Sequence, residues 1–521
     1  MEANLITTEF FEGYLRRKDK FWRDASPFPQ DCTPQQFSTI LQQHDGLFRL
    51  VIERGDNLLA AVDRVRSLPL FYMVNKGRLQ LSTNAFDLYD LLRPEKPDPG
   101  SINQFLLSGF VMGGDTLFSQ IKQLQAGQFL CWNKAQNKLR VKDYYRYIHI
   151  QGEAPDDPLA AMDDMHVRMA HSLIAGARGR TLAIPLSGGY DSRLLAVMLK
   201  RLGYDKVICF TYSHPHKGES KASRAIARYL GYPWRMLEYE PKAWYDAFQA
   251  DKRRQFFRFG TGLCSSPHIQ DWLAVWLLKQ HEELPPDTIF VPGHTGGFLQ
   301  GANLLPLFGK KEVISGIEVM NAIYFKHFNL WITYDEQFVK EMGDRFLELL
   351  QIRAVHTAEE AASLYDFFDW RERQAKFIVN SVRVYEFWGY EWRLPMWELD
   401  FLEYWRRIPI RQRFQRQLYK SYVAKYQKLP VPVYHDFSLL RRAWNRLTNP
   451  TRLPLRDPRY GRFLDPADKK AFLFSTVSTL LHPAISYPKF IDPQRYLCKT
   501  NLNAMQALLY LKELSEGKYQ R

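Results

Sequence analysis

The spacing of apolar residues divides the chain into two regions with different periods. In the first region short apolar runs alternate with turn signals, and these runs cover residues 46–52, 57–62, 70–74 and 78–83. Polar segments containing Gly55 and Gly77 separate the runs in pairs, as hairpin turns do. The pattern predicts an antiparallel sheet followed by a helix at residues 85–92. The stretch before it is hard to read, and we expect a loop at residues 24–34 because proline and polar residues are frequent there.

The second region alternates buried strands with amphipathic helices. Strands are expected at residues 182–185, 206–212 and 287–292, and helices at 159–177, 191–202 and 219–230. The helix after the first strand carries its apolar side chains on one stripe and ends at Gly203. This alternation predicts a doubly wound parallel sheet. Ligands of such sheets bind beyond the carboxyl ends of the strands, so we expect Thr211 to lie near a bound ligand.

The connection between the first of these strands and its helix has the most specific chemistry. It reads Leu186-Ser187-Gly188-Gly189-Tyr190-Asp191-Ser192. A loop at a helix N-terminus presents backbone N–H groups and the positive end of the helix dipole. The glycines let an anion approach the backbone and the serines add hydroxyl donors, so the segment predicts a phosphate-binding cradle. Asp191 cannot bind phosphate directly, but its carboxylate is suited to hold a Mg²⁺ ion that does.

The Ser-Gly-Gly-x-Asp-Ser pattern resembles the pyrophosphate-binding loop of the ATP pyrophosphatase superfamily. The resemblance implies an enzyme that cleaves ATP to AMP and pyrophosphate and activates a carboxylate or carbonyl as its adenylate. It implies that ATP or pyrophosphate contacts a set of loop residues: Leu186, Ser187, Gly188, Gly189, Asp191 and Ser192. It also implies that Mg²⁺ binds Asp191. An ordinary glycine turn is the structural alternative.

The first region resembles the glutaminase domain of asparagine synthetase B. Residues 45–48, 63–72 and 115–127 follow three segments of that family in order. The resemblance implies a truncated Ntn-type antiparallel domain at 1–145, an ATP-binding synthetase domain at 155–440, and a basic helical extension at 441–521 packed on the synthetase domain. Glutaminase activity in that family needs a cysteine at the second position, where this chain has Glu2. We therefore expect no glutamine hydrolysis, so free ammonia or a substrate amine would be the nucleophile.

A second loop departs from the family pattern. Gly293 keeps its first glycine, but Gly297 and Phe298 stand where the family has Asp and Glu. Two interpretations stay open. Mg²⁺ is held by Asp191, phosphates and waters alone, or adenylation is impaired and the chain is an interaction protein. Gly293 and His294 are expected to contact ATP or pyrophosphate.

Residues 391–398 and 401–409 resemble two segments that line the acceptor pocket in the same family. The resemblance implies substrate contacts for Arg393, whose planar fork suits a carboxylate, and for Glu398, which replaces an Asp. Helix packing with a buried ion pair is the alternative. Lys376 and Lys420 are candidates, by neighbourhood alone, for the catalytic lysine expected in related ligases.

Composition and charge bear on where the protein is located and on what it binds. The five cysteines are scattered without a Cys-x-x-Cys pair, no apolar run reaches 18 residues, and the N-terminus lacks the pattern of a secretory signal. These features predict a cytoplasmic protein without a membrane span. The net charge of +15 favours an anionic partner, with a solvated basic surface as the alternative.

The combined expectation is an ATP-dependent, AMP- and pyrophosphate-forming carbon–nitrogen ligase. Its carboxylate substrate would belong to a small molecule, a peptide natural product or a surface polysaccharide, because β-lactam synthetases, lasso-peptide cyclases and polysaccharide-amidating enzymes share this domain order. Two alternatives remain: a tRNA-modifying ATP pyrophosphatase, suggested by the basic charge, and a catalytically degenerate interaction protein. The matched first domain argues against binding of nucleic acid.

Overall fold

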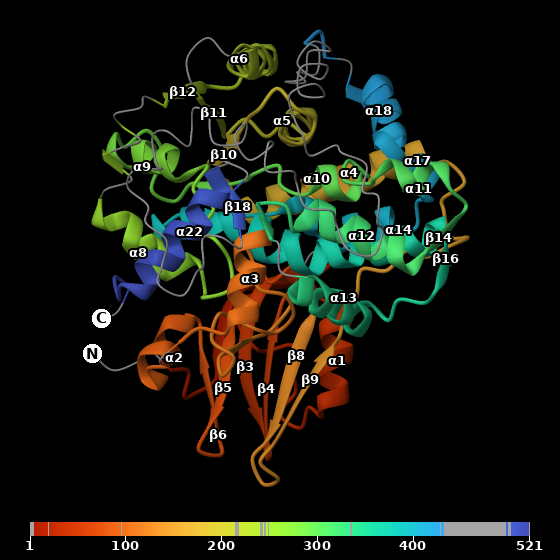
Figure 1. The fold of residues 1–521 in the computed structure, drawn as a ribbon. Coiled ribbons are helices and arrows are strands. Elements are labelled where there is room, and N and C mark those ends of the chain that lie inside the picture. Colours follow the sequence, from red (N-terminus) through yellow and green to blue (C-terminus); the bar gives the residue numbers. More distant parts are fainter. Residues whose placement is uncertain are drawn as a thin grey trace.

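The structure is a computed structural model, and it describes residues 5–18, 20–94, 96–213, 218–239, 243, 246–247, 250–333, 336–427, 429–431, 496–498 and 502–519. The chain is a mixed α/β protein with one antiparallel and one parallel main sheet. Figure 1 shows the antiparallel sheet at the bottom, the parallel sheet at the top, and helices between and around them.

The antiparallel sheet has six strands in the order β2-β1-β3-β4-β8-β9. They are β1 (Phe10–Arg17), β2 (Lys20–Trp22), β3 (Asp45–Arg54), β4 (Asn57–Val62), β8 (Gln128–Asn133) and β9 (Lys138–Asp143). A three-stranded sheet of β5 (Phe71–Asn75), β6 (Arg78–Ser82) and β7 (Lys122–Gln123) packs on one face. The predicted hairpins are therefore confirmed, because β3 pairs with β4 and β5 with β6, both antiparallel.

Alternation along these strands sorts side chains to two faces. Val51 and Ala60 pack toward the small sheet with Leu81, whereas Leu50 and Ala61 belong to the main core. The main core also receives α1 (Pro34–Gln43), which begins with a capping box between Thr33 and Gln36. The helices α2 (Ala85–Leu92) and α3 (Pro99–Ser108) complete this part of the chain.

The parallel sheet has five strands in the order β12-β11-β10-β13-β17. They are β10 (Leu182–Pro185), β11 (Val207–Ser213), β12 (Trp234–Glu238), β13 (Ile289–Phe290) and β17 (Glu391–Trp392). The chain adds β11 and β12 on one side of β10 and then crosses to add β13 and β17 on the other. The boundary between β10 and β13 is thus a topological switch point, where open α/β sheets bind ligands.

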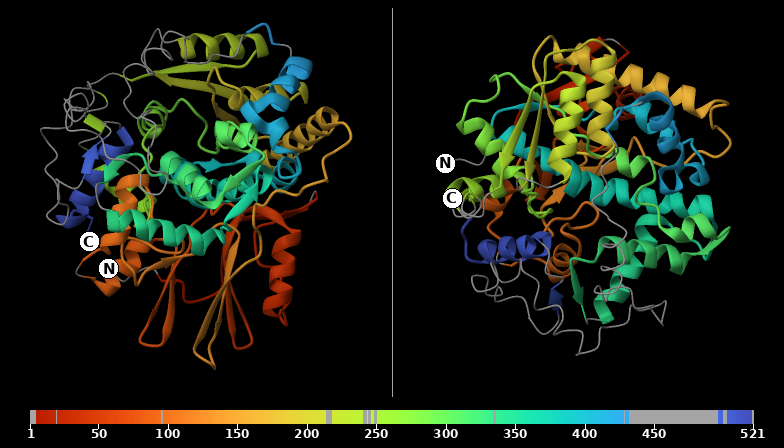
Figure 2. Two further views of the ribbon diagram at one scale, coloured as in Figure 1. Left: turned by 45° about the vertical axis from the view of Figure 1, so that its right-hand side comes forward. Right: turned by 90° about the horizontal axis from the view of Figure 1, so that it is seen from above.

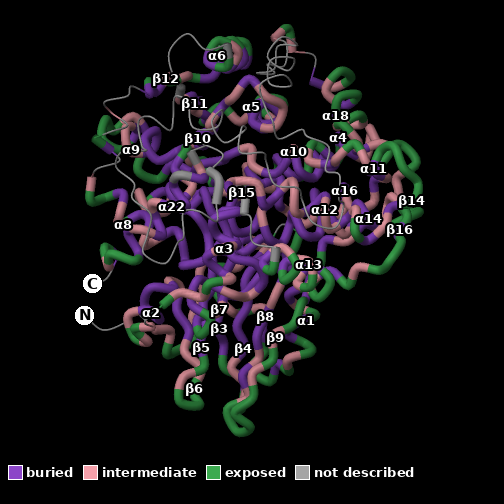
Figure 3. Tube along the Cα trace, in the orientation of Figure 1, coloured by how far each residue is buried: buried purple, intermediate pink, exposed green. Residues whose placement is uncertain are grey.

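Helices α4 (Pro158–Ala177), α5 (Asp191–Arg201) and α6 (Gly218–Leu230) pack in succession beside this sheet. The predicted domain boundaries at 145 and 155 fall in the connection between β9 and α4. Figure 2 shows these helices from two further sides, and Figure 3 shows that buried chain is concentrated between the two sheets.

The elements between β12 and β18 that have not yet been named lie between and around the two sheets. They are α8 (Asp251–Gly260), α9 (Trp272–Gln280), α10 (Gly296–Leu299), α11 (Pro306–Lys310), β14 (Val313–Ser315), α12 (Gly316–His327), β15 (Trp331–Thr333), α13 (Glu336–Leu350), β16 (Val355–Thr357), α14 (Ala358–Phe368), the π-helix η1 (Asp369–Ile378), η2 (Val379–Val382), α15 (Arg383–Phe387), η3 (Pro395–Trp397), α16 (Leu399–Trp405), α17 (Ile410–Arg413), η4 (Phe414–Arg416), α18 (Gln417–Tyr422) and η5 (Val423–Gln427).

The C-terminal residues pack on both parts of the molecule. Strand β18 (Tyr496–Cys498) pairs with β15, and α22 (Leu502–Ser515) packs on α3 and bonds α8 through Glu513. Residues 441–495 of the predicted helical extension lie outside the described residues. Among the helices that the structure describes, none has the length and apolarity needed to cross a membrane.

Candidate functional site

The segment 186–192 lies at the switch point of the parallel sheet, between β10 and α5. The Leu186 N–H donates to the Phe210 carbonyl at 2.8 Å, which continues the β10–β11 ladder by one residue. Thr211 is buried, and its hydroxyl donates to the Leu186 carbonyl. The structure therefore places Thr211 directly beneath the loop, where its hydroxyl supports the backbone.

Two serine hydroxyls brace the loop internally. Ser192 Oγ accepts from the Ser187 N–H at 2.9 Å and lies 3.1 Å from Ser187 Oγ. Ser187 Oγ also accepts from the Gly189 N–H at 3.2 Å. The cap position of α5, Tyr190, supplies no side-chain capping hydrogen bond, and the carboxylate in the first turn of this helix is that of Asp191. The N–H groups of Ser187 and Gly189 thus donate within the loop and fix its turn.

The second loop packs against the first at backbone level. A Cβ atom on Gly293 would lie 2.6 Å from the Ser192 nitrogen and 2.9 Å from the Asp191 carbonyl carbon. Only glycine fits there, because real Cβ atoms do not approach backbone so closely. Gly293 is thus required for the contact between the loops, and His294 follows it with Nδ1 at 3.4 Å from Ser381 Oγ. Burial lowers the pKa of His294.

Asp191 joins the two loops through its carboxylate. Its Oδ2 accepts from the Gly297 N–H at 3.0 Å, and its Oδ1 accepts from Arg416 NH2 at 2.6 Å. A Cβ atom on Gly296 would lie 2.6 Å from Oδ1, so glycine is needed for the carboxylate to reach this position. Where the asparagine synthetase pattern has a second acid, this chain has a backbone N–H at Gly297 and an arginine.

Arg416 is the functional candidate that the sequence did not indicate. Its guanidinium lies 4.6 Å from the Tyr190 ring centre and 5.1 Å from that of Tyr419, and it also donates to the Gln300 side chain. Gln415 and Arg416 have φ angles of 54° and 62°, a left-handed conformation that is uncommon for residues other than glycine. Two such residues in succession store strain of the kind that clusters at functional sites.

Arg393 and Glu398 lie against the antiparallel sheet. The Arg393 guanidinium lies 4.7 Å from the Tyr14 ring centre, and Glu398 accepts from Arg16 at 2.9 Å and from Ser172 at 3.0 Å. Burial, together with the nearby Asp45 carboxylate, raises the pKa of Glu398 to about 8, although Arg16 favours its charged form. The structure thus shows these two residues in contact with residues of the first sheet.

The two lysines considered from the sequence differ in their surroundings. Lys376 is buried and donates to Glu372 at 2.5 Å and to the Val111 and Gly113 carbonyls at 2.9 and 2.7 Å, which ties η1 to the first region. Lys420 is exposed. Two arginines reach the loop: Arg416 through the Asp191 carboxylate, and Arg193, whose NH2 donates to the Gly188 carbonyl at 3.4 Å.

The residues at the loop allow a limited role for Mg²⁺. Among the described residues there is no cluster of three His, Cys, Asp or Glu side chains able to hold a metal ion. Asp191 is the carboxylate at the loop, and both of its oxygens already accept hydrogen bonds. Since Mg²⁺ is often held by one or two carboxylates and substrate phosphates, Asp191 fits as its single protein ligand if Arg416 releases Oδ1.

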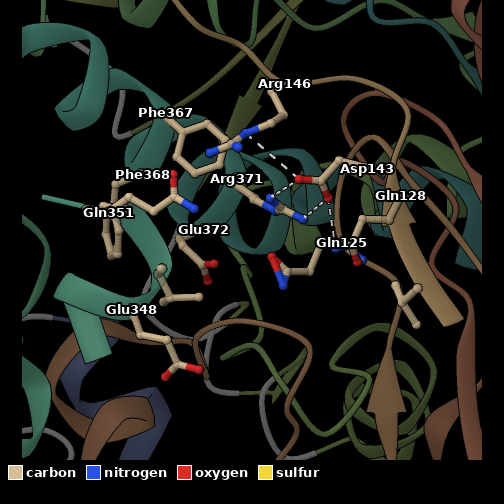
Figure 4. A pocket seen from close by; sticks show the side chains of 13 residues that line it. Gln125, Gln128, Asp143, Arg146, Glu348, Gln351, Phe367, Phe368, Arg371 and Glu372 are labelled. Atoms are coloured by element: carbon tan, nitrogen blue, oxygen red, sulfur yellow. Dashed lines mark hydrogen bonds and ion pairs between the residues drawn. The ribbon is translucent and has the colours of Figure 1, made fainter. Parts of the chain in front are cut away.

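A cavity of about 380 Å³ lies elsewhere, between β9, the end of α13 and η1 (Figure 4). Arg371 points across it and donates to Asp143 at 2.5 and 3.1 Å, and Glu372 in its wall is paired with Lys376. These charges pair within the wall. We take the 186–192 loop as the candidate anion site because it lies at a helix N-terminus and at the switch point of the parallel sheet.

No protein-family model matches the chain, and no curated protein matches it. A solved structure of glutamine phosphoribosylpyrophosphate amidotransferase from B. subtilis, complexed with ADP and GMP, matches 42% of this chain at 12% identity, with a TM-score of 0.16. A structure described as the allosteric regulatory enzyme of purine biosynthesis matches 39% at 11% identity, also with a TM-score of 0.16. The chain spans 63% and 49% of the lengths of these proteins.

Proposed function

We propose that the chain is an ATP-dependent, AMP- and pyrophosphate-forming carbon–nitrogen ligase. In this proposal the parallel sheet belongs to an asparagine-synthetase-like ATP-binding domain, and the antiparallel sheet belongs to a truncated glutaminase-like domain that does not hydrolyse glutamine. The observation that carries the proposal is the junction of two loops at the switch point. There Asp191 is held between the Gly297 N–H and Arg416, beside a glycine-rich helix N-terminus.

The proposed reaction has two steps. A carboxylate oxygen of the substrate attacks the α-phosphorus of ATP, the bond from this phosphorus to the bridging oxygen breaks, and pyrophosphate leaves with the electron pair. The nitrogen of an amine or of ammonia then attacks the acyl carbon, the C–N bond forms, AMP leaves, and the nitrogen loses a proton to solvent. The loop's own groups would bind the departing pyrophosphate in exchange for their present bonds within the loop, where the Ser187 and Gly189 N–H groups donate to serine hydroxyls.

Arg416 supplies the cation that this arrangement needs. A guanidinium is planar, stays charged and matches phosphate geometry with two parallel donors. It lies beside the rings of Tyr190 and Tyr419, which contact each other edge to face, and these two cation–π contacts hold it in place without loss of its charge. Bound Mg²⁺ would supply further neutralisation of the phosphates, with Asp191 as its protein ligand.

The substrate class rests on the resemblance alone. We propose a carboxylate on a small molecule, a peptide natural product or a surface polysaccharide, in the cytoplasm. The net charge of +15 would favour anionic molecules among these.

ATP–pyrophosphate exchange tests the proposal directly. The full chain would be incubated with Mg²⁺, ATP, labelled pyrophosphate and a panel of carboxylates from the three classes. Carboxylate-dependent incorporation of label into ATP is expected, and Asp191→Asn should reduce it by about a hundredfold, the size typical for one electrostatic contact of a transition state. Absence of exchange together with absence of Mg·ATP binding would contradict the proposal.

One observation favours the second candidate, a catalytically degenerate interaction protein. Phe298, where the family has an acid, is a core residue that is 3% exposed and lies 6.1 Å from the Trp397 ring centre. ATP binding without exchange for any carboxylate would support this candidate, because the inherited site would then bind but not react.

A further inference from the structure

We propose that Arg413, with its partners Asp366 and His149, is a positioning residue that sets both contacts of Asp191. The inference rests on the proposed function, because it assigns the support of the same phosphate site. It starts from a buried charged cluster between α14, α17 and the chain before α4.

Arg413 is fully buried and bonds in three directions. Its Nε donates to the Leu299 carbonyl at 2.9 Å, NH1 donates to His149 Nε2 at 2.7 Å, and NH2 donates to Asp366 Oδ2 at 2.6 Å. Burial alone would raise the pKa of Asp366, but the charge of Arg413 holds that pKa below its usual value. The guanidinium is therefore charged, neutralised and fixed by groups on three separate segments.

The first contact of Asp191 depends on the Nε bond. Leu299 is the last residue of α10, and Gly297 near the start of the same short helix donates its N–H to Asp191. The backbone of Arg413 also presses on the exit of α10, because a Cβ atom on Gly301 would lie 2.3 Å from the Arg413 carbonyl oxygen. Gly301 also has a φ angle of 90°, so glycine is needed both for the close approach and for the backbone angle.

The second contact depends on chain continuity. Arg416 follows Arg413 by three residues, through a turn whose Gln415 and Arg416 have left-handed backbone angles. Such a turn persists only when its surroundings fix it. Arg413 fixes the turn at its start, while the Arg416–Asp191 pair fixes it at its end. One buried guanidinium thus controls the positions of both groups that hold Asp191.

The test measures the Asp191–Arg416 coupling without relying on activity. The variants Asp191→Asn, Arg416→Gln and the double variant form a thermodynamic cycle, and their unfolding equilibrium constants give the coupling between the two side chains as a fold-change. With the rest of the chain unchanged, we expect a coupling of about fivefold, within the range for contacting charges. In an Arg413→Lys background, which keeps the charge but loses the fork and the Nε bond, the coupling should fall to near onefold. His149→Leu should weaken it and His149→Gln should restore it, because an amide oxygen can accept from NH1.

Arg253→Lys is the matched control. Arg253 forms an equally buried pair with Glu513, at 2.5 and 2.7 Å, on the α8–α22 side of the molecule. The Arg253→Lys substitution should lower stability by about the same factor as Arg413→Lys and leave the Asp191–Arg416 coupling unchanged. Persistence of the coupling in Arg413→Lys and His149→Leu, or its loss in Arg253→Lys, would overturn the positioning role.

The same variants separate this inference from the proposed function. If the chain catalyses exchange, Arg413→Lys should lower kcat at least tenfold with little change in the KM for the carboxylate. If the full chain shows no exchange while the coupling is lost only in the Arg413 and His149 variants, the proposed function fails and the positioning role stands.

Discussion

Arg416 and Asp191 are 225 residues apart in the sequence, and their side chains meet at 2.6 Å. Their exposed fractions are 15% and 23%, so the pair is shielded from water but not sealed from a ligand. A charge that approaches Asp191 therefore also meets the arginine. The net charge of the pair is zero, whereas two carboxylates at the same place would carry two negative charges.

Replacement of Arg416 should affect reaction more than folding. We expect Arg416→Gln to reduce the kcat of ATP–pyrophosphate exchange by about a hundredfold, because one preorganised charge facing a transition state contributes that much. Stability should change by about 1 kcal/mol or less, as for other partly exposed ion pairs. Arg411→Gln, on the same segment and 85% exposed, is the control and should change neither quantity. Equal exchange rates for the two variants would remove Arg416 from the reaction.

Gly293→Ala tests whether the two loops touch as described. A methyl group 2.6 Å from the Ser192 nitrogen must displace backbone, so we expect a loss of about 1–3 kcal/mol in the free energy of unfolding. Chemical denaturation would measure it.

Gly343→Ala supplies the comparison for that substitution. Gly343 lies inside α13, and a Cβ atom there would meet nothing within 4 Å. Because alanine favours helix over glycine, this variant should gain about 0.5–1 kcal/mol. A loss at Gly343, or none at Gly293, would contradict the packing of the second loop on the first.

Much of the fold could be predicted from the sequence, for reasons that particular residues show. The alternation at 46–62 predicts which side chains face the core, and the strand, glycine-rich loop and helix predicted over residues 182–202 correspond to β10, the 186–192 segment and α5. β1 was not predicted, since Gly13 and several charged residues interrupt its apolar pattern. It is nevertheless an inner strand, because β3 supplies its register and its burial.

The candidate site was predictable only in its local part. Ser187 and Ser192 act within one loop, so their spacing carries the information. Arg416 reaches Asp191 through a strained turn and a buried cluster, and neither leaves a periodic signal in the sequence. Arg393 and Glu398 stand in a segment that the sequence singles out. Their contacts with Tyr14 and Arg16 depend on how the first sheet packs against this segment, and local sequence patterns do not encode that packing.

The contact of Glu398 with β1 and α4 should depend on pH. The pKa of Glu398, about 8 in the folded protein, exceeds the ordinary value of 4.5, so the folded state binds the proton more tightly. Stability from this group is therefore fully present below about pH 4.5 and is lost as pH rises toward 8. We expect the wild-type free energy of unfolding, relative to Glu398→Gln, to fall by about 1 kcal/mol or more between pH 5 and 8. A difference that stays constant or grows would refute this assignment.

Restoring an acid at position 297 should change the metal requirement of exchange. A Cβ atom on Gly297 would lie 3.5 Å from Asp191 Oδ2 and 4.0 Å from Arg416 NH1, so the side chain in Gly297→Asp has room and a cation beside it. Arg416 could then pair with the new carboxylate and release Asp191 Oδ1 for Mg²⁺. We expect the Mg²⁺ concentration for half-maximal exchange to fall several-fold, because one or two carboxylates with phosphates are a usual Mg²⁺ ligand set. Gly297→Asn, which has similar size without the charge, should leave that concentration unchanged. If both variants behave alike, the volume of the side chain rather than its charge governs the loop, and Asp191 is not limited by its arginine.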